Sequence, residues 1–171
     1  MLPPWVGGGR HFVISMARTV TILLVEDDPN DALLVRMAFQ RTRSGIPLIL
    51  LPNGLEAINY LQGEGVYADR AKYPIPDIIL LDLKMPLMSG FDVLRWIRER
   101  PGLKRLPVIV LTSSVQDADA RTAYDAGANS YLVKPTDFNE LVESIKNLGD
   151  FWLDGSKLPQ TGPNAPEHPE P

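Results

Sequence analysis

Short, almost fully apolar runs alternate along the chain with segments in which apolar residues recur every three or four positions. A run that is apolar at nearly every position indicates a strand covered on both faces. Apolar residues at three- and four-residue spacing indicate one buried face of a helix. The expected strands comprise residues 20–26, 46–51, 77–82, 106–111 and 130–133.

A helix is expected after each strand. Asp28 should cap the first helix, with Pro29 at its first position, and Asp137 should cap the last one. Residues 116–125 have a weaker helical pattern that ends at Gly127. This alternation predicts an α/β fold, a doubly wound parallel sheet with helices on both faces. The residues expected on buried helix faces are Leu33, Leu34, Met37 and Ala38; Leu55, Ile58 and Leu61; Phe91, Leu94 and Ile97; and Leu141, Ile145 and Leu148.

The two ends differ in composition from this middle part. We expect a disordered N-terminal extension over residues 1–18, one domain over 19–153, and a proline-rich flexible tail over 154–171, which is too polar to offset its ordering cost. Met16 stands just before the first expected strand and is a candidate translation start. The apolar group at 151–153 is expected either to dock onto the domain or to form a dimer contact.

Polar side chains follow four of the expected strands, at the point where each strand ends. Because parallel strands end along one edge of a sheet, these groups should meet in one crevice outside that edge. Each also has a purely structural alternative. These are a solvated loop for Glu26 and Asp27, a helix cap for Asp28, a turn cap for Asp82, an ordinary strand-end hydroxyl for Thr112 and Ser113, and a solvated surface charge for Lys134. The groups are Glu26, Asp27 and Asp28; Asp82; Thr112 and Ser113; and Lys134, which precedes Pro135.

Together these side chains predict a cation and phosphoryl site. The neighbouring carboxylates of Glu26 and Asp27 repel each other unless a cation or protons relieve them. Asp82 follows four large apolar residues, so its carboxylate should be desolvated and in need of a partner. Mg2+ prefers oxygen ligands and binds through one or two carboxylates together with phosphate oxygens. A hydroxyl at Thr112 and an ammonium at Lys134 suit a phosphoryl group.

Composition narrows the classes of protein that fit. The chain has 171 residues, 44% of them hydrophobic, and a net charge of −4, so it has no basic footprint for nucleic acid. It contains no cysteine, which excludes disulfides and cysteine-bound zinc. No apolar stretch approaches the ~18 residues that span a bilayer. We therefore expect a cytoplasmic protein that binds neither nucleic acid nor membrane.

The motifs resemble the receiver domain of two-component response regulators over residues 20–148. The resemblance is carried by Val25-Glu26-Asp27-Asp28, by Leu80-Leu81-Asp82-Leu83-Lys84-Met85-Pro86 with Gly90, by Leu111-Thr112-Ser113, and by Tyr131-Leu132-Val133-Lys134-Pro135. It implies a five-stranded flavodoxin-like (βα)5 sheet with strand order 2-1-3-4-5. It also implies a phosphoprotein that accepts its phosphoryl group from a sensor histidine kinase, catalysing only its own phosphotransfer and autodephosphorylation.

The resemblance assigns a role to each site residue. Asp82 would accept the phosphoryl group. Mg2+ would be bound by Asp27, Asp82 and the backbone carbonyl of Lys84, with Glu26 acting through water. Thr112 and Tyr131 would form the switch, Lys134 would bind the phosphoryl group, and Lys84 and Ser114 would tune its hydrolysis.

Two features resemble the single-domain regulators that partner bacterial phytochrome histidine kinases. One is the long connection at residues 63–76, and the other is the continuation of the last helix into 151–153 and 158–159. Too few residues follow for a DNA-binding output domain, and a homodimer is left open.

Three other functions remain as alternatives. The chain could be a receiver-like interaction module that takes no phosphate. A magnesium phosphohydrolase of the haloacid dehalogenase type is disfavoured because Lys84 stands where that type has a second acid. A flavodoxin-type cofactor carrier is disfavoured because the loop after the first strand is acidic and would repel phosphate.

Overall fold

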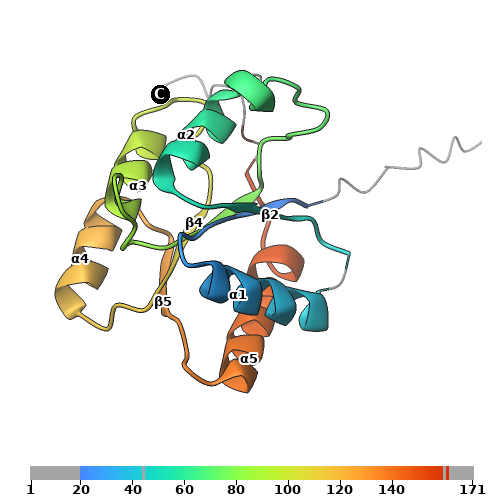
Figure 1. Cartoon of the computed structure of the whole chain (residues 1–171), viewed down its shortest axis with the longest axis vertical. Helices are drawn as coiled ribbons and strands as arrows, with labels where there is room; N and C mark the ends of the chain where they lie inside the picture. Colours follow the sequence, from blue (N-terminus) through green and yellow to red (C-terminus); the bar gives the residue numbers. More distant parts are fainter. Residues whose placement is uncertain (1–19, 44, 160, 162–171) are drawn as a thin grey trace, which may run out of the picture.

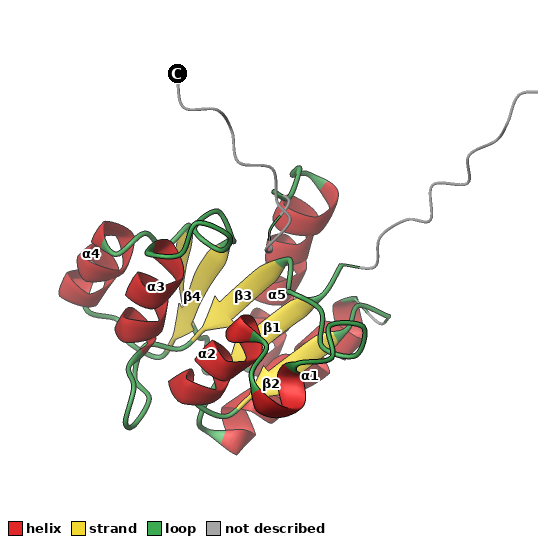
Figure 2. Ribbon diagram, turned by 90° about the horizontal axis from the view of Figure 1, so that it is seen from above, coloured by secondary structure: helices red, strands yellow, loops and turns green. Residues whose placement is uncertain are grey.

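Five parallel strands form one sheet in the order β2-β1-β3-β4-β5, with helices on both faces. The computed structural model describes residues 20–43, 45–159 and 161, and the fold is drawn in Figures 1 and 2. The predicted fold class and strand order are confirmed. The strands are β1 (Ile22–Val25), β2 (Leu48–Leu51), β3 (Ile78–Leu81), β4 (Val108–Thr112) and β5 (Ser130–Val133), and the helices are α1 (Pro29–Thr42), α2 (Gly54–Gln62), α3 (Gly90–Arg98), α4 (Asp117–Asp125) and α5 (Phe138–Gly149).

The sheet separates two hydrophobic layers because successive side chains of a strand point to opposite faces. In β1, Ile22 and Leu24 pack with α1 and α5, whereas Leu23 and Val25 pack with α2 and α3. Helices α1 and α5 lie side by side on the first face (Figure 1), and α2 and α3 cover the other (Figure 2). All four residues of β1 and of β3 are fully buried, as expected for strands covered on both faces.

Two predicted helix faces are wrong in part. In α1, Leu33, Leu34 and Met37 are each at least 40% exposed, and the buried residues are Val35, Ala38 and Phe39. In α2, Leu55 is 53% exposed, although Ile58 and Leu61 are buried as predicted. Both helices carry more apolar residues than one face can hold, and the face that meets the sheet excludes these four.

The connection between α2 and β3 is more ordered than a polar loop. It contains a 3-10 turn, Gly65–Tyr67, and the rings of Tyr60, Tyr67 and Tyr73 pack against one another with centroids 5.2–6.1 Å apart. The Tyr67 hydroxyl donates to Glu56, and the Arg70 guanidinium donates to the carbonyls of Tyr60 and Leu61 at the end of α2. The tyrosine cluster therefore fastens this connection onto α2.

The chain continues past α5 through a π-helical turn, Asp150–Asp154. Trp152, Leu153 and Leu158 pack against the hydrophobic layer of α1 and α5, so this group docks onto the domain, while Phe151 stays 62% exposed. Arg43, after α1, forms ion pairs with Asp150 and Asp154. The predicted N-terminal extension, residues 1–18, lies outside the described residues, as do residues 160 and 162–171 of the predicted tail, and the proposed domain boundaries remain predictions.

Within the described residues, no helix has both the length and the apolar character that are needed to cross a bilayer.

The tyrosine cluster leads to a prediction about alkaline pH. Burial raises the pKa of Tyr60 to about 12, whereas the hydrogen bond to Glu56 is the main cause that raises the pKa of Tyr67 to about 12. Because folding raises both values from 10.0, the stability they contribute is present below pH 10.0 and is lost as the pH rises through about 12.

Glu56→Gln should therefore lower the pKa of Tyr67 toward its ordinary value and leave that of Tyr60 near 12. Titration of the tyrosine ring carbons by NMR would measure the two values separately. An unchanged Tyr67 value in this variant would contradict the contact.

Candidate functional site

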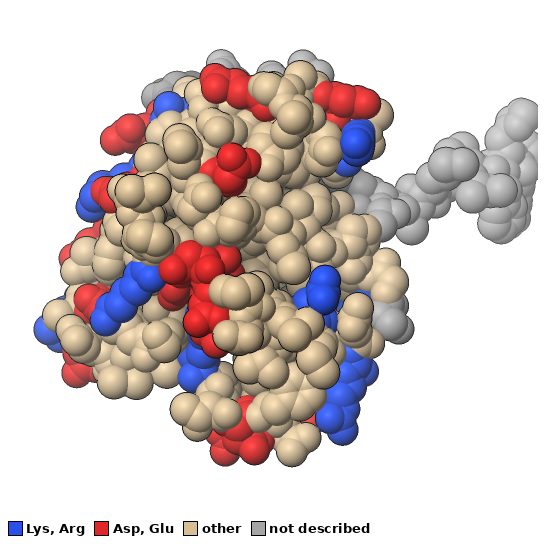
Figure 3. Space-filling model, viewed as in Figure 1, with Lys and Arg blue, Asp and Glu red and all other residues tan. Residues whose placement is uncertain are grey.

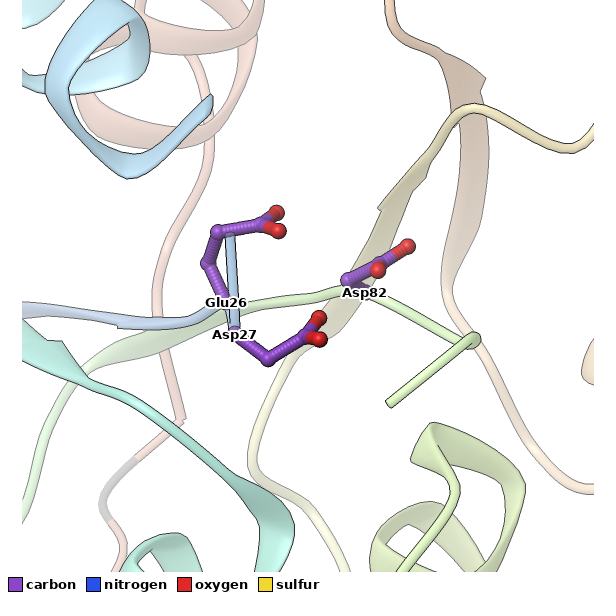
Figure 4. A group of neighbouring side chains, drawn as sticks. All are labelled: Glu26, Asp27 and Asp82. Atoms are coloured by element: carbon purple, nitrogen blue, oxygen red, sulfur yellow. The ribbon is translucent and has the colours of Figure 1, made fainter. Parts of the chain in front are cut away.

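The carboxyl edge of the sheet brings together acids that are far apart in sequence. Strands β1 and β3 pair in parallel with Val25 opposite Leu81, so Glu26 and Asp82 leave the sheet at the same level. The Asp82 amide also donates to the Val25 carbonyl at 3.0 Å. One carboxylate oxygen from each of Glu26, Asp27 and Asp82 lies within 4.8 Å of the other two, and Figure 4 shows these side chains around a common space.

This cluster is largely shielded from water. Glu26 and Asp82 are only 4% and 5% exposed, and Asp27 is half-buried. Acidic side chains gather near the middle of the face drawn in Figure 3, with basic side chains beside them. Burial is the main cause that raises the pKa of Glu26, and the Asp82 charge raises it further, against the lowering effect of Lys134. The site therefore holds more negative charge than its surroundings readily stabilise.

Lys134 is the buried cation of this edge. Its backbone amide donates to the Thr112 carbonyl at 2.8 Å, which ties the ends of β4 and β5 together. Its ammonium lies 2.5 Å from a Glu26 oxygen and 2.9 Å from an Asp31 oxygen. Burial lowers the pKa of Lys134, but hydrogen bonds to Glu26 and Asp31 outweigh this and leave the pKa raised. The ammonium therefore stays charged beside the acids.

Asp31 was not anticipated as part of the site. It follows the cap residue Asp28 on the first turn of α1, and its carboxylate contacts Lys134. Asp28 does cap that helix, and its Oδ1 accepts from the amides of Asn30 and Asp31. The one signal in the sequence was the position of Asp31 on the first helical turn after the acidic strand end.

The loop between β3 and α3 holds Asp82 from two sides. The Leu83 amide donates to Asp82 Oδ1 at 2.9 Å, which fixes the orientation of the carboxylate. Helix α3 begins so close to this strand end that a Cβ at Gly90 would lie 2.1 Å from the Asp82 carbonyl oxygen. Within the same loop, Leu87 has a positive φ of 68° and is fully exposed. Only glycine fits at position 90, and the structure gives the steric reason for a glycine that the sequence marked only as part of the motif.

Hydroxyl groups line the edge after β4. Thr112 is fully buried, and its Oγ1 accepts from the Ser114 amide at 3.4 Å. Ser113 is exposed, whereas Ser114 is buried and donates its hydroxyl to Asp119. The Tyr131 hydroxyl donates to the Ser114 carbonyl at 3.0 Å, and burial raises the pKa of Tyr131. Asp119, which also pairs with Lys84 at 3.5 Å, is a second neighbour that the sequence did not indicate.

The geometry around Lys134 leads to a prediction about stability. The side chains of Lys134 and Glu26 are only 9% and 2% exposed, so Lys134→Ala would leave a buried carboxylate without its ion-pair partner. Breaking such a pair destabilises a protein by about 3–5 kcal/mol. Urea unfolding should show this loss, and adding Glu26→Gln should restore much of it. Lys84→Ala, at a half-exposed ammonium, is the matched control and should be close to neutral. An equal loss in both single variants would contradict the role given to the buried pair.

Comparison with known proteins identifies the family to which the chain belongs. Residues 22–146 match the family described as "Response regulator receiver domain". Response regulator Rcp1 of Synechocystis is 38% identical over 138 residues, which is 81% of this chain and 92% of Rcp1. The phosphorylated cyanobacterial phytochrome response regulator RcpA superposes with a TM-score of 0.76 at 36% identity, over 82% of this chain and 98% of RcpA. The Mn2+-bound form of Rcp1 superposes with a TM-score of 0.73 at 38% identity, over 82% of this chain and 99% of that structure. The chain belongs to the response regulator receiver domain family.

Proposed function

We propose that this protein is a response regulator that accepts a phosphoryl group on Asp82 from the phosphohistidine of a sensor histidine kinase. The observation that carries the proposal is the convergence of Glu26, Asp27 and Asp82 at one sheet edge, with the Lys134 ammonium beside them. In the proposed step the attack on phosphorus comes from Asp82 Oδ2, the oxygen to which the Leu83 amide does not donate. A bond forms from Oδ2 to phosphorus, the bond from phosphorus to the histidine nitrogen breaks, and that nitrogen retains the electron pair.

The acid cluster fits a divalent cation. Its donors are carboxylate oxygens, which Mg2+ prefers, and the raised pKa of Glu26 reflects negative charge that a cation would relieve. Asp27, Asp82 and the carbonyl of Lys84 would hold Mg2+, with Glu26 acting through water. When bound, Mg2+ would neutralise negative charge on the phosphoryl oxygens during transfer. Rcp1, a relative of this chain, has been solved in a Mn2+-bound form, which supports the binding of a divalent cation by this protein.

Lys134 supplies the second positive charge. Its ammonium is held between Glu26 and Asp31, so it can exchange a carboxylate for a phosphoryl oxygen with a small movement. Preorganised charges in a site that excludes water stabilise charge that develops during a reaction. In this proposal Lys134 orients the phosphoryl group and does not bind the cation.

Thr112 and Tyr131 would transmit the change to the surface. A phosphoryl group on Asp82 adds roughly 1.5 to 2 negative charges at neutral pH. Thr112 turning its hydroxyl toward the new charge would break its bond with the Ser114 amide, and this would move the residue to which Tyr131 is bonded. The response would reach α4 and β5, whose surface would then be the one that a downstream partner reads.

The relatives support a phytochrome kinase as the partner. RcpA is named as a cyanobacterial phytochrome response regulator, and this chain matches nearly the whole of it. A cytoplasmic location remains a prediction from the sequence, and a homodimer is still open.

Asp82→Asn should abolish phosphorylation while leaving the fold intact, because the amide has nearly the same shape and no nucleophilic oxygen. The protein would be incubated with acetyl phosphate and Mg2+, and intact mass would report the added phosphoryl group. Asp125→Asn, at an exposed acid of α4, is the matched control and should be labelled like the wild type. Labelling of Asp82→Asn would remove it as the acceptor. A wild type that takes no phosphoryl group from acetyl phosphate or from a kinase would favour the phosphate-independent module.

Chelation of the cation gives an independent test. EDTA should abolish labelling of the wild type, and Asp27→Asn should raise the Mg2+ concentration needed for half-maximal labelling by about tenfold or more, since one of the few carboxylate ligands is lost. Asp28→Asn is the matched control, because asparagine caps a helix as well as aspartate and Asp28 is assigned only to the cap. Equal effects of the two substitutions would count against a cation site at Asp27.

A further inference from the structure

A carboxylate on α4 links two loops that flank the acceptor. Asp119 lies on the first turn of α4, and its Oδ2 accepts a hydrogen bond from the Ser114 hydroxyl. The same oxygen lies 3.5 Å from the ammonium of Lys84, which stands two residues beyond Asp82. The Asp119 side chain is only 22% exposed, whereas that of Lys84 is 54% exposed. The Lys84 side chain is therefore held toward α4 by a partly buried acid.

Ser114 is the hub of this arrangement. Its amide donates to Thr112 Oγ1 at 3.4 Å, its hydroxyl donates to Asp119, and its carbonyl accepts from the Tyr131 hydroxyl at 3.0 Å. Its Oγ also accepts from the amide of Gln116, the residue that precedes α4. The side chain of Gln116 makes no capping bond, so the start of α4 is fixed through Ser114 and Asp119. A substitution at Asp119 would therefore affect Lys84 in the loop after β3 and Ser114 in the loop after β4.

Charge decides what this contact does once Asp82 carries a phosphoryl group. The new group brings about 1.5 to 2 negative charges close to Lys84 and competes with the single charge of Asp119 for the ammonium. While Asp119 retained Lys84, one side of the phosphoryl group would stay open to water. When Lys84 is released, its ammonium can pair with the phosphoryl oxygens and cover that side.

We propose that Asp119 is a positioning residue that holds the Lys84 ammonium away from the acceptor and thereby shortens the lifetime of the aspartyl phosphate. The inference rests on the proposed function of Asp82. In the step concerned, a water oxygen bonds to phosphorus, the bond from phosphorus to the Asp82 oxygen breaks, and the carboxylate leaves with the electron pair. The proton of the attacking water goes to solvent or to the released phosphate.

Asp119→Asn should lengthen the half-life of the phosphorylated protein by about two- to fivefold, which is the range an exposed ion pair supplies. The full chain would be phosphorylated with acetyl phosphate and Mg2+, the donor would be removed, and intact mass would follow the decay. Asp117→Asn, at an exposed acid on the same turn, is the control for loss of charge and should decay like the wild type. Asp119→Glu keeps the charge and should retain most of the wild-type rate.

A double-mutant cycle separates positioning from a merely structural role. In a Lys84→Ala background, Asp119→Asn should have little further effect on the half-life, because the ammonium that it would release is absent. A loss of packing alone would alter the half-life equally in both backgrounds, and that result would overturn the proposal. An unchanged or shorter half-life in Asp119→Asn, with the wild type labelled normally, would overturn it as well and leave the proposed function standing. Failure of the wild type to take a phosphoryl group would overturn both.

Discussion

The parallel register of β1 and β3 forces negative charges together at the carboxyl edge of the sheet. With Val25 paired to Leu81, the backbone cannot separate Glu26 from Asp82 without breaking ladder hydrogen bonds between fully buried strands. Like charges in a poorly solvated site repel each other, and the ion pair with Lys134 offsets only part of this repulsion, since the pKa of Glu26 stays raised. The fold thus maintains an electrostatic imbalance that a divalent cation would correct. The hydrophobic layers on both faces of the sheet stabilise the strand register that keeps these charges together.

Neighbouring elements keep this edge narrow. The absence of a side chain at Gly90 lets α3 begin against the Asp82 carbonyl, and the Leu83 amide fixes the carboxylate itself. On the other side, the bond from the Lys134 amide to the Thr112 carbonyl joins the ends of β4 and β5. Asp82, the proposed acceptor, therefore lies among fixed backbone elements, whereas the groups proposed to respond to it lie at the end of β4, in the loop that leads into α4 and in β5.

Most of this arrangement could be predicted from the sequence, because apolar runs indicate buried strands and the strands of a parallel sheet end along one edge. Glu26, Asp27 and Asp82 could be predicted as neighbours for that reason, and so could Lys134 as a cation near them. The predicted buried face of α1 was wrong because two different sets of apolar residues in this helix have helical spacing. Leu33, Leu34 and Met37 recur at helical spacing, yet Val35, Ala38 and Phe39 do so as well. Only packing against the sheet and α5 decides between the two faces. Asp31 and Asp119 were missed because their partners, Lys134 and Lys84, are distant in sequence and are brought near by the sheet.

Helix α4 is the element that a change at the acceptor can most easily move. Its N-cap residue makes no side-chain capping bond and its one buried residue is Ala123, whereas α1, α2, α3 and α5 all have a side-chain cap and several buried residues. The bonds that fix its start converge on Ser114, and each such hydrogen bond is worth only about 0.5–1.5 kcal/mol. A phosphoryl group on Asp82 needs to outweigh only a few of them to shift α4 and Tyr131. If Asp82 accepts a phosphoryl group as proposed, the weak anchoring of this helix would allow that local change of charge to alter a surface of the protein.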